Sequence, residues 1–352
     1  MKSLTRQDTQ QLRGLAILFI ILHNFCHLLP GAIVENEFIW NYTPVLNGRF
    51  VLQSELPLVL NFFSHYGFYG IALFVFLSGY GLSIKYDKQD NLSIINYLVQ
   101  HATKLWRLIF IGILIHYIAF RLLGGDQPSW HQIVKLYTFV TNLLPHSNQI
   151  FGPWWWFSLI MQFYVVYIIF YYKKSLRFIG VFSLICLLLQ FAVTFICRHD
   201  LTNEQGLLAY LHYNFPTLVL PFSLGVCASR NWLDWMNSWY LIVASIIIVF
   251  LGSYNVWIWC LSCVFACIVL INLGNLLCRS RWLSAGLSWL GMVSAWAFVI
   301  HPIVRRYVFR LYFTHSLLFI LMLYLVITLA LSFVMYEIMA FIDRKIQYAD
   351  NN

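Results

Sequence analysis

Residues 12–30 read LRGLAILFIILHNFCHLLP, an apolar run of membrane-spanning length that nevertheless carries three ionisable side chains. These are Arg13, His23 and His27. Placing an arginine at the centre of a bilayer costs about 3 kcal/mol even on lenient insertion scales, so intramembrane ionisable residues usually face a cavity inside the protein. We therefore predict a membrane helix here and take these three side chains as the first functional candidates.

The composition excludes a soluble globular protein. Of the 352 residues, 61% are hydrophobic and 10% are charged, and the mean hydropathy is +0.73. Such a chain has too little polar surface to cover a soluble core. The net charge of +9 is spread over the ends of apolar runs, which argues against nucleic-acid binding and favours anionic lipid and an anionic ligand on the inner side.

Apolar runs of about 17–25 residues, enough to cross a bilayer, recur along the whole chain. We predict an all-α, polytopic membrane protein that forms a single transmembrane domain over residues 1–352, without an appended soluble domain. The ten expected spans are 12–29, 58–84, 104–123, 153–172, 178–197, 207–229, 239–254, 255–273, 285–304 and 315–342. Only a short turn separates 239–254 from 255–273, so nine and eleven spans are the alternatives.

The distribution of positive charge predicts the orientation. With ten spans and both termini in the cytoplasm, most of the 22 lysines and arginines lie on the cytoplasmic side, as the positive-inside rule requires. Arg305, Arg306 and Arg310 are the exception, because they follow the ninth span on the outer side. Two interpretations are open: these arginines reach lipid phosphates, or they bind an anionic acceptor.

Helical geometry brings the two histidines of the first span together. At about 100° per residue, His23 and His27 lie one turn apart and about 40° apart around the helix, so both can line one cavity. Arg13 lies further toward the cytoplasm on a neighbouring azimuth, and we expect it to share one protein-lined passage with His23. This arrangement suits binding of a phosphate-bearing donor and deprotonation of an alcohol. The alternative is a buried histidine that bonds to a carbonyl group of a neighbouring helix.

The sequence favours chemistry without a metal ion. His23, His27 and His301 could meet in space, but no carboxylate motif accompanies them. The eight cysteines lie inside apolar runs, where cysteine behaves as a small hydrophobic residue. We therefore expect no metal and assign the cysteines to packing.

Five motifs, in order along the chain, resemble those of the acyltransferase family 3 membrane proteins. They are Arg13-Gly-Leu-Ala-Ile leading into His23, Gly-x-x-Gly-x-x-x-Phe-x-Phe-Leu-Ser-Gly-Tyr at 67–80, Lys104-Leu-Trp-Arg107, Trp155-Trp156-Phe-Ser-Leu-Ile-Met-Gln162-Phe-Tyr164, and Ser294 through His301-Pro302. The resemblance covers nearly the whole chain, including the expected ten helices.

The resemblance implies an O-acetyltransferase in the bacterial inner (plasma) membrane. Family members move an acyl group, commonly acetyl, from a cytoplasmic acyl-CoA to a sugar hydroxyl on a surface polysaccharide or a lipid-linked glycan. The essential arginine and histidine of the family's first helix correspond to Arg13 and His23. His27 is the partner of His23 or its substitute as the base, because the spacing from Arg13 to His23 is one residue shorter than in most members.

The remaining candidates divide into donor and acceptor groups. Arg13, Lys85, Lys104 and Arg107 are expected at the cytoplasmic edge, where they could hold the phosphates of acyl-CoA. The candidates for substrate binding are His65, Ser78, Tyr80, Trp155, Gln162 and His301. Many family members carry an acid at the position of Gln162. The expected partners are acyl-CoA, the glycan and membrane lipid, and the sequence leaves a homo-oligomer open.

Two other functions fit the same helices. One is a transporter or exporter of a glycan precursor or an anionic metabolite, although such proteins tend to show two matching halves with interrupted helices. The other is a glycan- or lipid-binding scaffold, which would tolerate loss of Arg13 and His23. Consumption of acyl-CoA by membranes distinguishes the enzyme from both.

Overall fold

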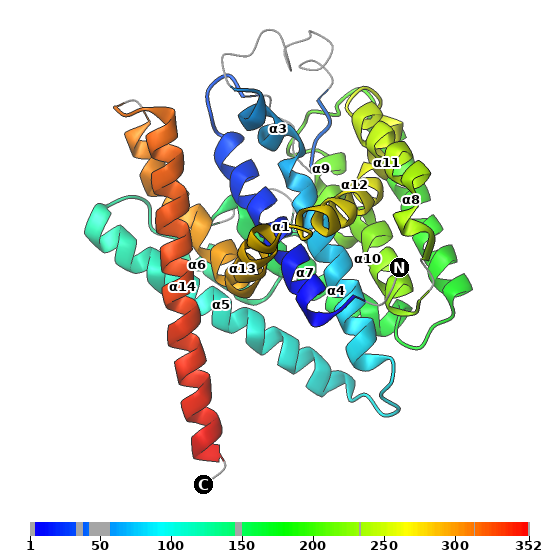
Figure 1. Ribbon diagram of the computed structural model, residues 1–352, viewed down its shortest axis with the longest axis horizontal. Helices are drawn as coiled ribbons and strands as arrows, with labels where there is room; N and C mark the ends of the chain where they lie inside the picture. Colours follow the sequence, from blue (N-terminus) through cyan, green and yellow to red (C-terminus); the bar gives the residue numbers. More distant parts are fainter. Residues whose placement is uncertain are drawn as a thin grey trace.

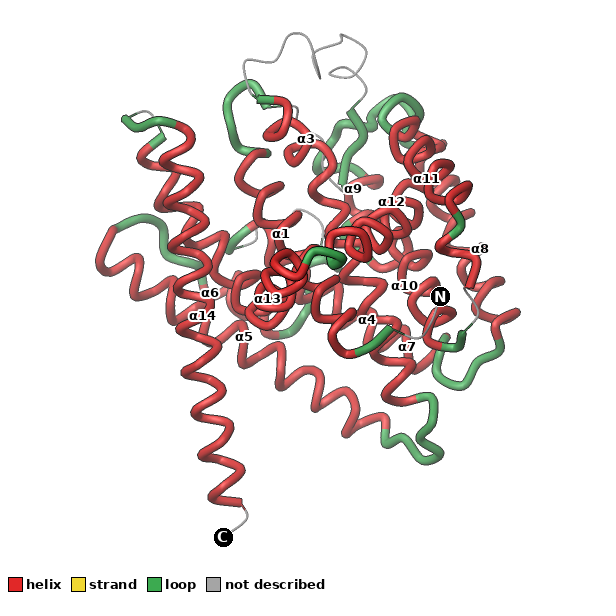
Figure 2. The backbone as a smooth tube through the Cα atoms, in the orientation of Figure 1, coloured by secondary structure: helices red, strands yellow, loops and turns green. Residues whose placement is uncertain are grey.

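The computed structural model describes residues 4–32, 38–41, 57–144, 150–231, 234–312 and 314–350. Within these ranges the chain is a bundle of helices joined by loops, and no strand is present (Figure 2). The all-α prediction is therefore confirmed for the described residues.

The helices follow one another closely along the chain. Those that matter for the site are α1 (Arg6–Cys26), α3 (Leu58–Tyr66), the 3-10 turn η1 (Gly67–Tyr69), α4 (Gly70–Tyr86), α5 (Ile94–Leu123), η2 (Gly152–Trp154), α7 (Trp155–Phe170), α10 (Val219–Ser229), α13 (Arg281–Val308) and α14 (Leu317–Asp350). The others are α6 (Trp130–Tyr137), α8 (Leu176–Ile196), α9 (Leu207–His212), η3 (Phe215–Leu218), η4 (Asp234–Asn237), α11 (Trp239–Gly252), α12 (Val256–Leu277) and η5 (Phe309–Leu311).

Helices occupy all ten predicted spans. Seven helical segments in the described part of the chain are long and apolar enough to cross a membrane. The three predicted spans outside this set are 12–29, 207–229 and 239–254. The first forms α1 but includes polar and charged residues, and the last forms the 14-residue α11.

Proline and serine explain two departures from the predicted boundaries. The span expected over 207–229 is divided into α9, η3 and α10, because Pro216 lacks a backbone N–H and disfavours helical geometry in the residue before it. The span expected to begin at 104 instead begins at Ile94, where the Ser93 hydroxyl accepts a hydrogen bond from the backbone N–H of Asn96. Lys104 therefore lies inside α5 rather than at its start.

Helix α1 lies inside the bundle, where it contacts α13, α4, α3 and α12 (Figure 1). Its tightest neighbour is α13. A Cβ atom added at Gly14 would overlap the Leu287 carbonyl oxygen, and one added at Gly291 would overlap the Gln10 carbonyl oxygen. Glycine at both positions lets the two backbones touch. Gln10 adds a hydrogen bond of 2.9 Å from its side-chain amide to the Ser288 carbonyl oxygen.

The other helices enclose this central pair. Helix α4 packs on α1 and on α10, while α11 and α12 form a hairpin (Figure 1). Helix α14 contacts α13 along one edge of the bundle, and its C-terminal part extends beyond the other helices (Figure 1). Because α1 is enclosed, its polar side chains can face protein rather than lipid.

Replacing Gly291 by alanine should destabilise the protein, because the new methyl group forces α13 away from α1. We expect the Gly291→Ala protein to melt several degrees below the wild type in a thermal assay in detergent. Gly286→Ala is the matched control, since no atom lies within 4 Å of a Cβ at Gly286 on the same helix. Equal melting temperatures for the two variants would contradict the close packing of α1 and α13.

Candidate active site

A cavity of about 220 Å³ lies at the C-terminal end of α1. Ile20, His23 and Asn24 of α1, with His27 and Leu28 directly after it, line one side of the cavity. The nine remaining lining residues come from other parts of the chain, and five of them are aromatic: Phe38, Ile71, Gly152, Pro153, Trp155, Trp156, Tyr213, Phe298 and Arg305. We call this the histidine cavity. It confirms that the two histidines line one cavity and places Trp155 beside them.

The imidazole of His23 is held in one orientation. Its Nδ1 lies 3.2 Å from the Phe63 carbonyl oxygen on α3, and its ring packs edge-on against Phe68. A carbonyl oxygen only accepts hydrogen bonds, so Nδ1 donates and therefore carries the proton. In the neutral ring Nε2 is then left with its lone pair. The contact with a neighbouring carbonyl group, predicted from the sequence as the alternative to a functional role, is therefore present, and it leaves the Nε2 lone pair able to accept a proton.

The backbone at Gly67 fixes the position of His23. A Cβ atom at Gly67 would lie 2.6 Å from the His23 Cβ and 3.0 Å from the Phe19 carbonyl oxygen. Only glycine allows the turn η1 to approach α1 this closely. The Gly67 of the family-like motif at 67–80 therefore supports the histidine rather than a ligand.

His27 lies one turn beyond His23 and is half-buried. The centroids of the two rings are 5.3 Å apart. The Nδ1 atom of His27 has no hydrogen-bond partner among the described residues. His27 is thus the less constrained of the two imidazoles.

Arg305 of α13 completes the histidine cavity. Its Nη1 donates hydrogen bonds of 2.6 Å to the backbone carbonyl oxygen of Asn24 and of 2.9 Å to the side-chain oxygen Oδ1 of Asn24. The Asn24 amide nitrogen in turn donates to the Ile20 carbonyl oxygen. The charge distribution in the sequence predicted that Arg305 belongs to an outer basic cluster. Its position four residues after His301 was the signal that it lies on an inward face of α13.

The other two arginines of that predicted cluster bind the protein itself. Arg306 donates to the Ile150 carbonyl oxygen and stacks on the ring of Phe151. Arg310 donates to the carbonyl oxygens of Leu123 and Gly124. The cluster predicted from the sequence is therefore divided, and of its three members only Arg305 lines the histidine cavity.

Arg13 lies outside the histidine cavity. It precedes His23 by ten residues on α1, which corresponds to about 15 Å along a helix. Its side chain is exposed, although Leu12 and Gly14 on either side are buried, and it interacts electrostatically with the Tyr164 hydroxyl. The sequence predicted one passage shared by Arg13 and His23, but Arg13 is not among the described residues that line the histidine cavity.

Arg13 belongs instead to a group of basic and aromatic side chains toward the N-terminal half of α1. The ring of Tyr164 lies 3.9 Å from that of His101, measured between centroids, and the Tyr86 hydroxyl lies 3.2 Å from His101 Nε2. Lys85 and Lys104 interact electrostatically with His101. We call Arg13, Lys85, Tyr86, His101, Lys104 and Tyr164 the basic aromatic cluster. Its cations Arg13, Lys85 and Lys104 were predicted from the sequence, whereas its aromatic members were not.

Arg107, also predicted to bind the donor, is paired with a carboxylate. Its two terminal nitrogens donate to the two oxygens of Asp343 at 2.8 and 3.0 Å. This bidentate ion pair joins α5 to α14. The guanidinium is therefore already satisfied by the protein.

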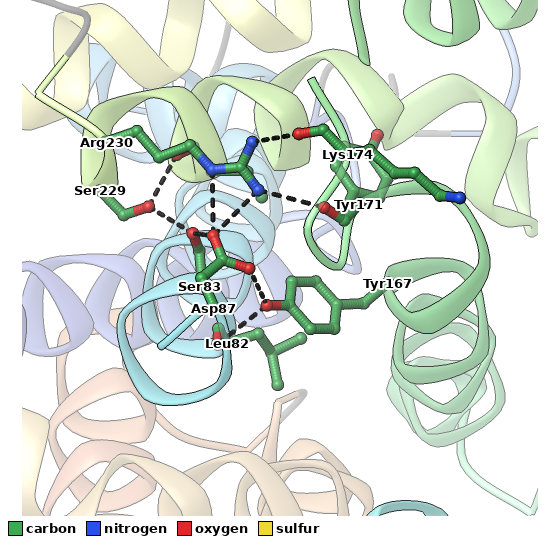
Figure 3. Close-up of polar contacts among 9 residues, drawn as sticks. Leu82, Ser83, Asp87, Tyr167, Tyr171, Lys174, Ser229 and Arg230 are labelled. Atoms are coloured by element: carbon green, nitrogen blue, oxygen red, sulfur yellow. Dashed lines mark hydrogen bonds and ion pairs between the residues drawn. The ribbon is translucent and has the colours of Figure 1, made fainter. Parts of the chain in front are cut away.

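A polar network fixes the end of α4 next to the basic aromatic cluster (Figure 3). Arg230 pairs with Asp87 at 2.9 Å, and the hydroxyls of Tyr167 and Ser83 donate to the same carboxylate at 2.7 and 2.5 Å. Arg230 also bonds the Tyr171 carbonyl oxygen. The network ties α4 to α7 and α10 and occupies both oxygens of Asp87, so this carboxylate serves the structure rather than proton transfer.

Three more substrate-binding candidates make hydrogen bonds within the protein. The Ser78 hydroxyl donates to the Phe74 carbonyl oxygen of its own helix, and Tyr80 donates to the Leu4 carbonyl oxygen. His65 Nε2 lies 2.8 Å from the Ser253 hydroxyl. None of these three side chains lines the histidine cavity.

Gln162 and His301 also lie apart from the histidine cavity. The Gln162 amide donates to Asn214, and its carbonyl oxygen accepts from the Phe215 N–H. His301 is fully buried, with Nδ1 3.0 Å from the Ala297 carbonyl oxygen and no hydrogen-bond partner for Nε2 among the described residues. Pro302 leaves the carbonyl group of Phe298 without its helical N–H partner, whereas the carbonyl group that His301 contacts is that of Ala297.

Comparison with known families decides the identity of the domain. The family model described as an acyltransferase domain matches residues 9–337. The chain belongs to acyltransferase family 3. The match confirms the resemblance in the five motifs, and together with the seven apolar helices it makes the protein a multi-pass membrane acyltransferase. Neither a curated protein nor a solved structure matched the chain.

The described part of this acyltransferase contains no group of three or more histidine, cysteine or acidic residues arranged to hold a metal ion. Of the ionisable candidates, His23 and His27 line the histidine cavity, and Arg13, Lys85 and Lys104 belong to the basic aromatic cluster. Imidazole groups can transfer protons, and guanidinium and ammonium groups can bind anions.

Gly67→Ala tests whether the turn η1 positions His23. The added methyl group should displace the imidazole, and we expect acyl transfer to fall at least tenfold because a base misplaced by about 1 Å loses much of its effect. Gly81→Ala on α4 is the matched control, since no atom lies within 4 Å of a Cβ there. Transfer by the Gly67→Ala protein at the wild-type rate would rule out this role.

Proposed function

We propose that this protein is an integral membrane O-acyltransferase that moves an acetyl group from cytoplasmic acetyl-CoA to a hydroxyl of a surface polysaccharide or lipid-linked glycan. The observation that carries the proposal is the hydrogen bond from His23 Nδ1 to the Phe63 carbonyl oxygen, which leaves Nε2 unprotonated on a side chain that lines an aromatic-walled cavity. The family membership supports the acyltransferase activity. Donor, acceptor and residue roles are our assignment.

The proposed orientation has ten spans, with both termini in the cytoplasm and the protein in a bacterial inner membrane. The N-terminal half of α1 then faces the cytoplasm and the histidine cavity lies toward the outer side. Such an arrangement places the basic aromatic cluster where acyl-CoA is available and the histidines where a glycan is available. The positive charge of the predicted inner loops supports it.

The basic aromatic cluster is the proposed site for the coenzyme. Arg13, Lys85 and Lys104 supply positive charge for its phosphates, and none of them forms a salt bridge within the described residues. The half-buried ring of Tyr164 offers a surface for the adenine. The pantetheine arm would follow α1 for about 15 Å to bring the thioester to His23.

The histidine cavity is the proposed site for the acceptor. Trp155 and Trp156 give it flat apolar walls, while Asn24, His27 and Arg305 supply polar groups. A sugar has both apolar faces and hydroxyl groups, so this combination suits it. Trp155 is thus the substrate-binding candidate that the geometry supports best.

The proposed reaction is direct transfer with His23 as the general base. Nε2 takes the proton of the acceptor hydroxyl while that oxygen attacks the thioester carbonyl carbon. The tetrahedral intermediate then collapses, the carbon–sulfur bond breaks, and the coenzyme A thiolate takes the proton back from the imidazolium. His27 lies close enough to assist the proton transfer or to replace His23 as the base.

Replacing His23 by alanine should lower acetylation of the cell-surface glycan about 100-fold or more, because a general base typically contributes 10²–10⁴ to the rate. His27→Ala should cause a smaller loss. Mass spectrometry of glycan from cells carrying each variant measures the effect, and His199→Ala, at an exposed position of the loop after α8, is the control.

Full acetylation in both histidine variants would refute the mechanism. If the protein were an exporter, membranes with the wild-type protein would not consume radiolabelled acetyl-CoA. This assay therefore distinguishes an exporter from the enzyme without any variant.

A further inference from the structure

Among the described residues that line the histidine cavity, Arg305 is the one with a permanent positive charge. Arg305 is partly buried, and its interactions extend to His23, His27 and His301, on which its charge acts. A permanent positive charge therefore lies beside both candidate bases.

Most of the hydrogen-bonding capacity of Arg305 remains unused. An arginine has five N–H donors, and in the described structure only Nη1 makes hydrogen bonds, both to Asn24. No carboxylate of the described residues pairs with Arg305, whereas Arg107 and Arg230 each have an aspartate. A partly buried guanidinium without a counter-charge favours the binding of an anion.

The two hydrogen bonds to Asn24 orient the guanidinium of Arg305. Nη1 donates to both the backbone carbonyl oxygen and the side-chain oxygen of Asn24, which follows His23 directly and precedes His27 by three residues. The base and the residue that holds the Arg305 guanidinium thus lie on the same turn of α1. Nε and Nη2 of Arg305 remain as donors for a ligand.

We propose that Arg305 binds the oxyanion that forms during acyl transfer, with Asn24 as its positioning residue. The inference rests on the proposed acyltransferase function. When the acceptor oxygen bonds to the thioester carbon, the electron pair of the C=O double bond moves onto the carbonyl oxygen, and Arg305 stabilises that negative charge while His23 holds the acceptor's proton. As the C=O bond re-forms, the carbon–sulfur bond breaks and the thiolate leaves.

Such a role predicts a loss in turnover rather than in donor binding. Removing one oxyanion donor typically lowers kcat by 10²–10³. We expect Arg305→Gln to show a loss of about this size in transfer from [14C]acetyl-CoA to membranes of the expressing cells, with KM for acetyl-CoA changed by less than about twofold. Arg305→Lys keeps the charge and should retain more activity than Arg305→Gln.

Asn24→Asp provides a variant that changes charge at nearly constant shape. The carboxylate keeps the contact with Nη1 but supplies the counter-charge that Arg305 lacks, so kcat should fall here too. Arg310→Gln is the control, because Arg310 bonds only carbonyl oxygens of Leu123 and Gly124 in the described structure. Each variant is compared with the wild type for melting temperature and membrane level.

The outcomes separate this inference from the proposed function. If wild-type membranes transfer no acetyl group, the proposed function fails. If the wild type is active and the folded Arg305→Gln protein has the same kcat, or if only KM for acetyl-CoA rises, the oxyanion role is overturned. If Arg305→Gln does not fold, a wild-type kcat in Asn24→Asp overturns it, and a lowered kcat supports it.

Discussion

The enclosure of α1 by other helices is the constraint on which the site depends. The two imidazoles in the apolar part of this helix are tolerated only where protein rather than lipid surrounds them. The contact of Gly14 and Gly291 with opposing carbonyl groups seats α1 against α13, and Gly67 lets the turn η1 reach His23 from the other side. His23 then donates to the Phe63 carbonyl oxygen, and one ring nitrogen remains free for chemistry.

Eight of the positive charges named above fall into two classes by their place in the fold. Arg107, Arg230, Arg306 and Arg310 lie outside both the histidine cavity and the basic aromatic cluster, where they bond carboxylates or backbone carbonyl oxygens and hold helices and loops together. Arg13, Lys85, Lys104 and Arg305 have no salt-bridge partner within the described residues. The second class lies at the two places where a negatively charged donor and a negatively charged intermediate are proposed. This division supports transfer between two separate binding regions along α1.

The helices and the principal imidazoles could be predicted from sequence, because apolar length and helical spacing are local properties. All ten predicted spans are helical, and His23 and His27 share a cavity with Trp155. The break between α9 and α10 at Pro216 and the early start of α5 after Ser93 also have local causes, although hydropathy alone does not predict them. Family motifs added the acyltransferase activity, which composition does not reveal.

The rest depends on contacts between distant segments. Nothing in the sequence indicates that Arg305 bonds Asn24, or that Arg107 is neutralised by Asp343, since each pair is separated by more than 200 residues. The separation of Arg13 from the histidine cavity likewise follows from the packing of α7 and α5, whose Tyr164 and His101 form the surroundings of the basic aromatic cluster. Spacing along the sequence predicts which residues share one face of a helix, but not which other segments pack against that face.

A cryo-electron microscopy structure of the protein in nanodiscs with a non-hydrolysable thioether analogue of acetyl-CoA tests the central claim most directly. The account predicts phosphates at the basic aromatic cluster and an acetyl carbonyl carbon within about 6 Å of His23 Nε2, which leaves room for one hydroxyl oxygen between them. An analogue bound with its acetyl group elsewhere, and the histidine cavity closed to it, would contradict the account.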